Sequence, residues 1–281
     1  MKRLPQSELP LSHWKQLTGE EVHQFIEQGY VVVHKVFSRE LAAQTIPLVW
    51  AELDIDPRDS STWASPLVML KKVLENPPFP QIHTERYLGA VDDLCGQGRW
   101  HATMGVGHWP ILLPGFAKPP WCPPKTGWHV DIALDHPRVD SPELGLVNVE
   151  FFTDITPGGG GTAVRVGSHC RVARILEEAQ RDGRMNQDEL HLLTLSDTDH
   201  LPVVGVIAQA GDVLMMHPFM VHAASSNTSD RARVAAVKLI RLIEPMNLMR
   251  PDSGAYSPVE RAIVEALART DDGSTDESDE S

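Results

Sequence analysis

The feature that most constrains the fold of this chain is a series of short β-rich segments in its second half. Glycine, proline or aspartate separates them, and they lie at residues 128–132, 145–153, 162–166, 203–209, 212–216 and 233–243. Short strands that recur at this spacing, with turn residues between them, indicate an antiparallel sandwich or barrel. With 42% hydrophobic residues, the chain can bury a core of that kind.

Helix signals lie on both sides of this β-rich region. Thr18 and Glu21 form a capping box, and Gly29 is a natural helix end before the β-branched run at residues 30–33. We expect further helices over residues 38–53, around 66–74, as a pair within 171–195, and from Ser257 onward.

These signals divide the chain into three parts. Residues 1–17 are expected to be a flexible lead-in, residues 18–268 one domain, and residues 269–281 a disordered acidic tail without apolar side chains.

Composition restricts the partners. The formal net charge is −13 and no cluster of lysine and arginine stands out, which argues against a nucleic-acid partner. The three cysteines have unrelated spacings and fit neither a disulfide framework nor a cysteine-based zinc site. No apolar run reaches 18 residues, and the N-terminus lacks the apolar stretch of a signal peptide. We therefore expect a cytoplasmic protein that does not span a membrane, and its oligomeric state is not predictable.

Three residues could bind one metal ion. His129 and Asp131 lie two apart in an expected strand, so both side chains would project from the same face. His222 ends a second apolar segment that starts with the turn at Gly211 and Asp212. Two imidazoles and one carboxylate are the ligands of non-haem Fe(II) oxygenases, although zinc hydrolases also use them. The His129 and Asp131 pair alone would be explained as well by a buried histidine bound to its neighbour.

Arg233 favours iron with an oxoacid. It begins another apolar segment, eleven residues after His222. A buried guanidinium at this place can bind a carboxylate through two parallel hydrogen bonds.

These residues resemble the phytanoyl-CoA dioxygenase family of Fe(II)- and 2-oxoglutarate-dependent oxygenases. The resemblance extends over nearly the whole chain and rests on the following residues: Leu17–Val22, Phe25, Gly29, Tyr30–Val33, Trp128–Asp131, Gly161–His169, Gly211, Asp212, His222, Asn227, Ser229 and Arg233. It implies a double-stranded β-helix (a cupin-like jelly roll), mainly β with flanking helices, whose core we expect at about residues 100–245.

The resemblance also implies roles for single residues. His129, Asp131 and His222 would bind Fe(II), and Arg233 would bind the remote carboxylate of 2-oxoglutarate, with Arg231 as a rival for that role. Thr126 and Thr162 correspond to positions that lie near this cosubstrate in some members. With O2 as the other cosubstrate, the expected reaction is hydroxylation or another oxidation of a small, largely apolar metabolite, which yields succinate and CO2. The alternatives are a jelly roll that binds a metal or ligand without turnover, and a zinc hydrolase.

Some positions depart from the family pattern or are expected to be structural. Val166 replaces a proline, Ala224 stands where many members have serine or glycine, and the retained Asp131 favours hydroxylation over halogenation. His217 and His169 are expected to be structural. The proline-rich loop at residues 110–124 is expected to shape a substrate pocket.

Overall fold

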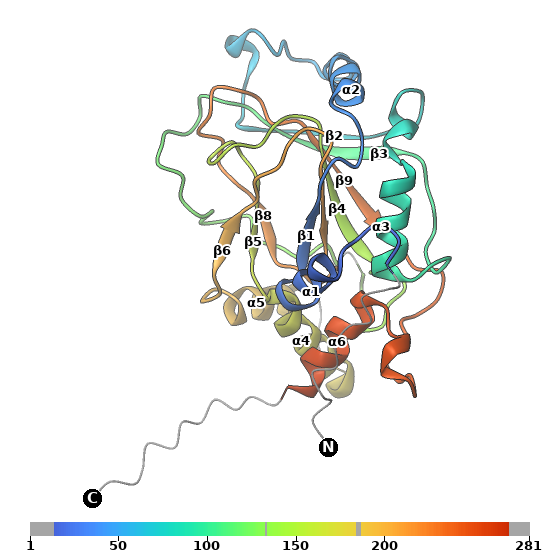
Figure 1. Cartoon of the computed structure of the whole chain (residues 1–281). Coiled ribbons are helices and arrows are strands. Elements are labelled where there is room, and N and C mark those ends of the chain that lie inside the picture. The colour runs from blue at the N-terminus through green and yellow to red at the C-terminus, as the bar shows by residue number, and fades with distance from the viewer. Residues whose placement is uncertain (1–13, 133, 184–186, 270–281) are drawn as a thin grey trace, which may run out of the picture.

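Three antiparallel sheets form the centre of the structure (Figure 1). This computed structural model describes residues 14–132, 134–183 and 187–269. Its strands are β1 (Tyr30–Val33), β2 (Leu67–Leu74), β3 (Val106–Leu112), β4 (Leu146–Phe151), β5 (Thr162–Arg165), β6 (Val203–Gly205), β7 (Val213–Met216), β8 (His222–Ala224) and β9 (Ala235–Ile240). One sheet has the order β1-β7-β4-β9, β2 pairs with β3, and β5 lies between β6 and β8. All these strand pairs are antiparallel, which confirms that expectation.

The helices gather mainly at one end of the sheets. They are α1 (Gly19–Gln28), α2 (Arg39–Ala51), α3 (Glu85–Cys95), α4 (Ser168–Asp182), α5 (Gln187–Asp197) and α6 (Pro258–Ala268), and 3-10 turns lie at Ser60–Thr62, Phe79–Ile82 and Ser253–Ala255. Figure 1 shows α1, α4, α5 and α6 together below the sheets, α3 beside them and α2 at the opposite end. More of the described residues lie in α-helices than in strands. The fold is therefore mixed α and β, and the prediction of a mainly β chain was wrong.

The helix ends follow the sequence signals. The capping box of Thr18 and Glu21 is present, and Gly29 ends α1 with a φ of 86°, a left-handed conformation that glycine adopts without steric cost. Ser257 and Glu260 form the same box at the start of α6. The pair of helices within 171–195 is confirmed as α4 and α5.

The segment around 66–74 is not a helix as predicted but the strand β2. Its sequence, LVMLKKVL, has apolar residues at helical spacing, and pairing with β3 decides the conformation instead. Because β1 and β2 both precede residue 100, the β core extends beyond the range of about 100–245 that we expected.

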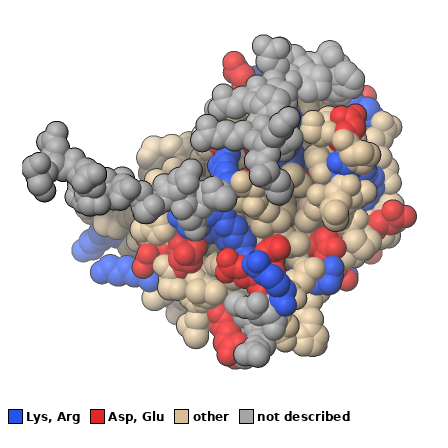
Figure 2. All heavy atoms as spheres, turned by 90° about the horizontal axis from the view of Figure 1, so that it is seen from below, with Lys and Arg blue, Asp and Glu red and all other residues tan. Residues whose placement is uncertain are grey.

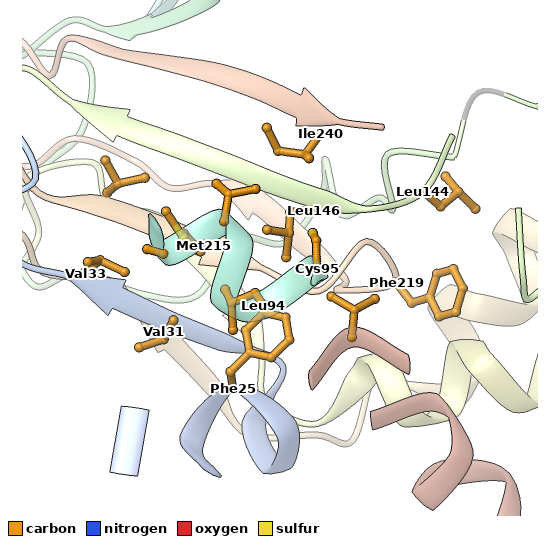
Figure 3. Packing of buried hydrophobic residues seen from close by; sticks show 14 of the residues in the cluster. Phe25, Val31, Val33, Leu94, Cys95, Leu144, Leu146, Met215, Phe219 and Ile240 are labelled. Atoms are coloured by element: carbon orange, nitrogen blue, oxygen red, sulfur yellow. The ribbon is translucent and has the colours of Figure 1, made fainter. Parts of the chain in front are cut away.

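Two hydrophobic cores lie on the two faces of β4. Val147, Val149 and Phe151 face a core between the sheets that also contains Val164 of β5. Leu146 faces the larger core, where side chains of α1, β1 and α3 meet those of the sheet (Figure 3). The alternation of strand side chains thus separates a sandwich interior, which holds the candidate site, from a layer that anchors the helices.

Residues 15–17, which we expected to belong to the flexible lead-in, are bound to α3. Asp93 accepts hydrogen bonds from the backbone N–H groups of Lys15, Gln16 and Leu17 at 2.8–3.0 Å. The ordered domain therefore includes them. The rest of the lead-in, residues 1–13, and the tail from 270 onward lie outside the described residues.

The surface and the cysteines match the composition. On the face shown in Figure 2, basic and acidic side chains are interspersed. All three cysteines are free thiols. No helix in the described part of the chain is both long and apolar enough to cross a membrane.

Candidate metal centre and cosubstrate site

His129, Asp131 and His222 converge on one point between the sheets. One ligand atom of each side chain lies within 4.8 Å of those of the other two. In the described part of the chain, no other group of three or more histidine, cysteine or carboxylate side chains is placed in this way. Asp131 Oδ1 lies 3.6 Å from His129 Nε2, and Asp131 Oδ2 lies 3.4 Å from His222 Nε2. One carboxylate thus faces two imidazole nitrogens, an arrangement that could hold a divalent transition metal ion.

Backbone carbonyls fix the two imidazoles. His129 Nδ1 lies 2.9 Å from the carbonyl oxygen of Gly127, and His222 Nδ1 lies 3.0 Å from that of Met220. A carbonyl can only accept, so both Nδ1 atoms carry a proton. In the neutral imidazole Nε2 is then the free ligand atom, and in the protonated imidazole it donates toward Asp131. Such outer hydrogen bonds are what metal-binding histidines normally have, so the donor set fits a metal.

Charge couples the three groups. Burial raises the pKa of Asp131, but the hydrogen bond and charge of His222, with smaller effects of His129 and His108, bring it below its ordinary value. Burial lowers the pKa of His129. Burial also lowers the pKa of His222, yet the contact with Asp131 outweighs it and the net shift is upward. In the absence of a metal ion, the carboxylate is therefore held in its ionised form.

The elements that carry the ligands differ from the prediction. Residues 128–132 do not form a strand: only His129 pairs, in an isolated bridge with His222 whose N–H···O distances are 3.0 and 2.9 Å. The segment from Gly211 to His222 is not one strand but two, β7 and β8, separated by residues 217–221. The single bridge is enough, because it places the two imidazole rings with centroids 4.4 Å apart.

A cation–π contact supports the first ligand segment. The Arg165 guanidinium lies 4.7 Å from the ring centroid of Trp128, next to His129. The same guanidinium donates to the carbonyl of Leu195 and to Thr198 Oγ1, both at 2.8 Å. Residue Trp128 is thereby tied to the end of α5, which replaces the support that strand pairing would have given.

Arg233 lies deep in the same cavity without a partner of opposite charge. It is 3% exposed and donates to the carbonyl of Pro110 at 2.8 Å and to Thr162 Oγ1 at 3.1 Å, while its buried Nε has no partner among the described residues. Burial lowers its pKa to about 10, so it stays charged at neutral pH. A buried unpaired cation beside a cavity indicates an anionic ligand.

The other two cosubstrate candidates and the rival arginine lie in different surroundings. Thr162 begins β5, is buried and lines the cavity beside Arg233. Thr126 and Arg231 are exposed, and neither is among the cavity-lining residues of the described chain.

The cavity has a volume of about 690 Å³ and opens between the sheets. The proline-rich loop contributes Phe116 and Ala117, as expected of a pocket-shaping loop. Four further polar residues line the cavity that the sequence did not indicate as site residues: Lys71, His108, Ser225 and Ser226. Ser225, beside the departure at Ala224, has a buried hydroxyl without a hydrogen-bond partner among the described residues, and His108 projects from β3. Ser225 could have been found, because it neighbours the position where the family has a hydroxyl.

His217 and His169 are structural. His217 Nε2 contacts the carbonyl of Val259 at 3.2 Å, and His169 Nε2 contacts that of Ile26 at 2.9 Å. Burial lowers the pKa of both. These contacts agree with the prediction that both histidines are structural.

The sequence matches the family described as "Phytanoyl-CoA dioxygenase (PhyH)" over residues 25–235, three quarters of the chain. The chain belongs to this family. It is thus a member of the 2-oxoglutarate-dependent non-haem iron oxygenases, whose cofactor and cosubstrate are Fe(II) and 2-oxoglutarate.

Several solved structures have a similar fold. EvdO2 from Micromonospora carbonacea var. aurantiaca has 16% identity and a TM-score of 0.52, covering 86% of this chain and 97% of that one. EctD from S. alaskensis, solved with 2-oxoglutarate and 5-hydroxyectoine, has 16% identity and a TM-score of 0.51, covering 84% and 81%. HygX from Streptomyces hygroscopicus, solved with nickel and 2-oxoglutarate, has 17% identity and a TM-score of 0.50, covering 80% and 87%. The likeness implies a double-stranded β-helix. No curated protein matched the sequence.

Proposed function

We propose that this PhyH-family protein is an Fe(II)- and 2-oxoglutarate-dependent dioxygenase that hydroxylates or otherwise oxidises a small, largely apolar metabolite, with succinate and CO2 as coproducts. In this proposal His129, Asp131 and His222 hold the iron. The observation that carries it is the presence, in one cavity, of this ligand cluster and the unpaired guanidinium of Arg233.

Each residue has a role that follows from its contacts. The backbone carbonyls that accept from His129 and His222 keep both Nε2 atoms free to bind iron. Arg233 and Thr162 bind the remote carboxylate of 2-oxoglutarate, which satisfies the charge and the buried Nε of Arg233. The bound iron supplies the activation of O2, while the protein orients both substrates and excludes water from them.

The cavity lining supports an apolar substrate. Leu67, Met69, Phe116, Val237 and Leu239 all line it, and apolar atoms make up most of its wall. The acidic overall charge and the interspersed charges in Figure 2 offer nothing that would attract a nucleic acid. A small molecule held between the sheets of a jelly-roll core fits this environment.

The test measures succinate. Anaerobically purified protein is reconstituted with Fe(II), and succinate is quantified after addition of 2-oxoglutarate and O2, with and without candidate metabolites. We expect succinate to appear even without a metabolite, at a slow uncoupled rate. We also expect the variant Asp131→Ala to lose it by about 100-fold or more, because a metal ligand is removed.

A matched control and a metal analysis complete the test. His217→Gln removes a buried imidazole outside the ligand cluster and should retain iron binding and succinate formation. Stoichiometric zinc with hydrolysis that requires no O2 would support the zinc-hydrolase alternative and refute the proposal. Iron binding without any 2-oxoglutarate turnover would indicate a non-catalytic protein.

A further inference from the structure

A second group of polar side chains, Lys71 and His108, lines the cavity besides Arg233. Arg233 pairs with Leu112 in an isolated bridge at one end of β3. His108 lies four residues before Leu112 in β3, so the backbones of these two residues are about 13 Å apart at roughly 3.3 Å per residue. Lys71 of the neighbouring β2 lines the cavity beside it. Met69, Pro110, Val237 and Leu239 also line the cavity.

A local irregularity of the sheet aims His108 into the cavity. The register between β2 and β3 shifts between Leu70 and Val73, so that Lys71 and Lys72 bulge opposite His108. His108 has a φ of 43°, a left-handed conformation that is uncommon for residues other than glycine. Bulges and such backbone strain recur beside functional sites, where they redirect a side chain.

The two lysines of the bulge have different surroundings. Lys72 forms an ion pair with Glu52 at 2.6 Å. Lys71, by contrast, has no carboxylate partner within the described part of the chain, although the chain carries 38 acidic residues against 25 basic ones. An unpaired ammonium at the mouth of an apolar cavity, next to an imidazole, is available to a ligand.

The apolar part of the mouth is unusually exposed. Met69, Phe116 and Leu239 are 44%, 46% and 43% exposed, and all three line the cavity. Large apolar side chains that gather around a cavity indicate a surface that a ligand covers. The mouth therefore combines an apolar wall with the ammonium group of Lys71 and the imidazole of His108.

We infer that Lys71 and His108 recognise an anionic oxygen group on the substrate, whose apolar body lies against Met69, Phe116 and Leu239. The substrate class is thus an apolar carboxylic acid, and these two residues determine specificity. The inference rests on the proposed function, since it takes Arg233 and the metal ligands to be occupied by the cosubstrate and iron. Hydrogen bonds from the Lys71 ammonium and the His108 imidazole would hold the acid group, while the apolar body covers the exposed apolar side chains of the mouth.

The test compares acids with their amides. Protein loaded with Mn(II), which does not support turnover, and with 2-oxoglutarate is titrated by calorimetry with decanoate and 2-naphthoate and with the corresponding primary amides. We expect at least one acid to bind about tenfold or more tighter than its amide, because hydrogen bonds to charged groups are the stronger ones. Lys71→Met and His108→Asn should each reduce this preference, and the double variant should abolish it.

The controls separate this inference from folding defects and from the proposed function. Asparagine tolerates the positive φ at residue 108, so His108→Asn should fold. Lys72→Met removes the neighbouring, ion-paired lysine and should leave the acid preference unchanged. Acids that bind no tighter than amides, no binding of either, or a preference that survives in the double variant would overturn the inference. The inference would also be overturned if Lys71→Met weakened the binding of 2-oxoglutarate and left the binding of the acid unchanged. Uncoupled succinate formation by the wild-type protein tests the proposed function independently of all these outcomes.

Discussion

The surroundings of Arg233 give the clearest indication of the kind of ligand that the cavity binds. Its guanidinium is buried, has two neutral hydrogen-bond partners and leaves Nε without one. Taking a charge out of water costs several kcal/mol unless an opposite charge replaces the lost hydration. The protein therefore retains an unfavourable group that a bound carboxylate would compensate.

Replacing Arg233 should weaken the binding of 2-oxoglutarate and leave the binding of iron unchanged. Removing one partner of a buried charge pair costs about 2–5 kcal/mol, so Arg233→Ala should raise the Kd of 2-oxoglutarate by about 30-fold or more. Arg233→Lys should be intermediate, because an ammonium cannot match the planar fork. The measurement is titration of the Mn(II)-loaded protein with 2-oxoglutarate. Arg231→Ala, at the exposed rival position, is the control, and a larger effect there would exchange the two roles.

Ser168 is expected to position the distal iron ligand. Its buried hydroxyl accepts the N–H of Val221 at 2.9 Å, directly before His222. Ser168→Ala leaves this N–H without a partner, which should lower stability by about 1–3 kcal/mol and iron affinity by about tenfold. Iron affinity is measured by anaerobic competition with a chelator.

The control for Ser168 is another buried serine. Ser257→Ala removes the N-cap of α6 and should cost about 1 kcal/mol of stability while leaving iron affinity unchanged. An equal loss of iron affinity in both variants would show that Ser168 acts only through global stability.

At the scale of elements, β4 carries a buried polar pair on its helix-facing side. Glu150 is fully buried and accepts a hydrogen bond from the Tyr87 hydroxyl of α3 at 3.0 Å, and Asn148 donates to that same hydroxyl at 2.9 Å. Burial raises the pKa of Glu150 to about 7 from its ordinary value of 4.5, although the positive charge of Lys238 opposes the shift.

This shift predicts a pH dependence of stability. The folded state holds the proton of Glu150 more tightly than the unfolded state does. The stability that this proton contributes is therefore fully present below pH 4.5 and is lost as the pH rises through about 7. Over that window the loss should be on the order of 3 kcal/mol. The Glu150→Gln variant cannot ionise at this position. Its free energy of unfolding, measured with urea, should therefore decrease less between pH 4.5 and pH 7 than that of the wild-type protein. Identical pH profiles would mean that Glu150 is ionised in the fold.

The elements also show what the sequence can and cannot predict. Capping boxes at Thr18 and Ser257 are local signals, and both helices begin where predicted. The segment of β2 was mistaken for a helix because its apolar spacing fits both structures, and only the partner strand decides. Residues 128–132 were predicted as a strand although one bridge at His129 suffices. His108 was missed because its orientation depends on a bulge in another strand.

At the scale of the molecule, the site lies where two layers meet. The four-stranded sheet supplies Val149, and the three-stranded sheet supplies Thr162 and His222. Arg233 lies just before β9 and is bridged to Leu112 of β3. The sandwich core beneath them, which includes Phe151 and Val164, consists of apolar side chains and contains no metal ligand among the described residues. We therefore expect the fold to form without the metal.

This independence predicts how the whole protein responds to metal and cosubstrate. The metal-free protein should unfold cooperatively when heated with a chelator, since its cores are complete without the ion. Mn(II) at about 100 times its Kd should add about 2.7 kcal/mol, or roughly 5–10 °C in Tm for a chain of this size. 2-Oxoglutarate should raise Tm further only when the metal is present, because its binding uses both the ion and Arg233. Thermal unfolding followed by circular dichroism measures all three states. A cosubstrate shift of equal size in Asp131→Ala, which cannot hold the ion, would show that 2-oxoglutarate binds without the metal centre and would contradict the shared site.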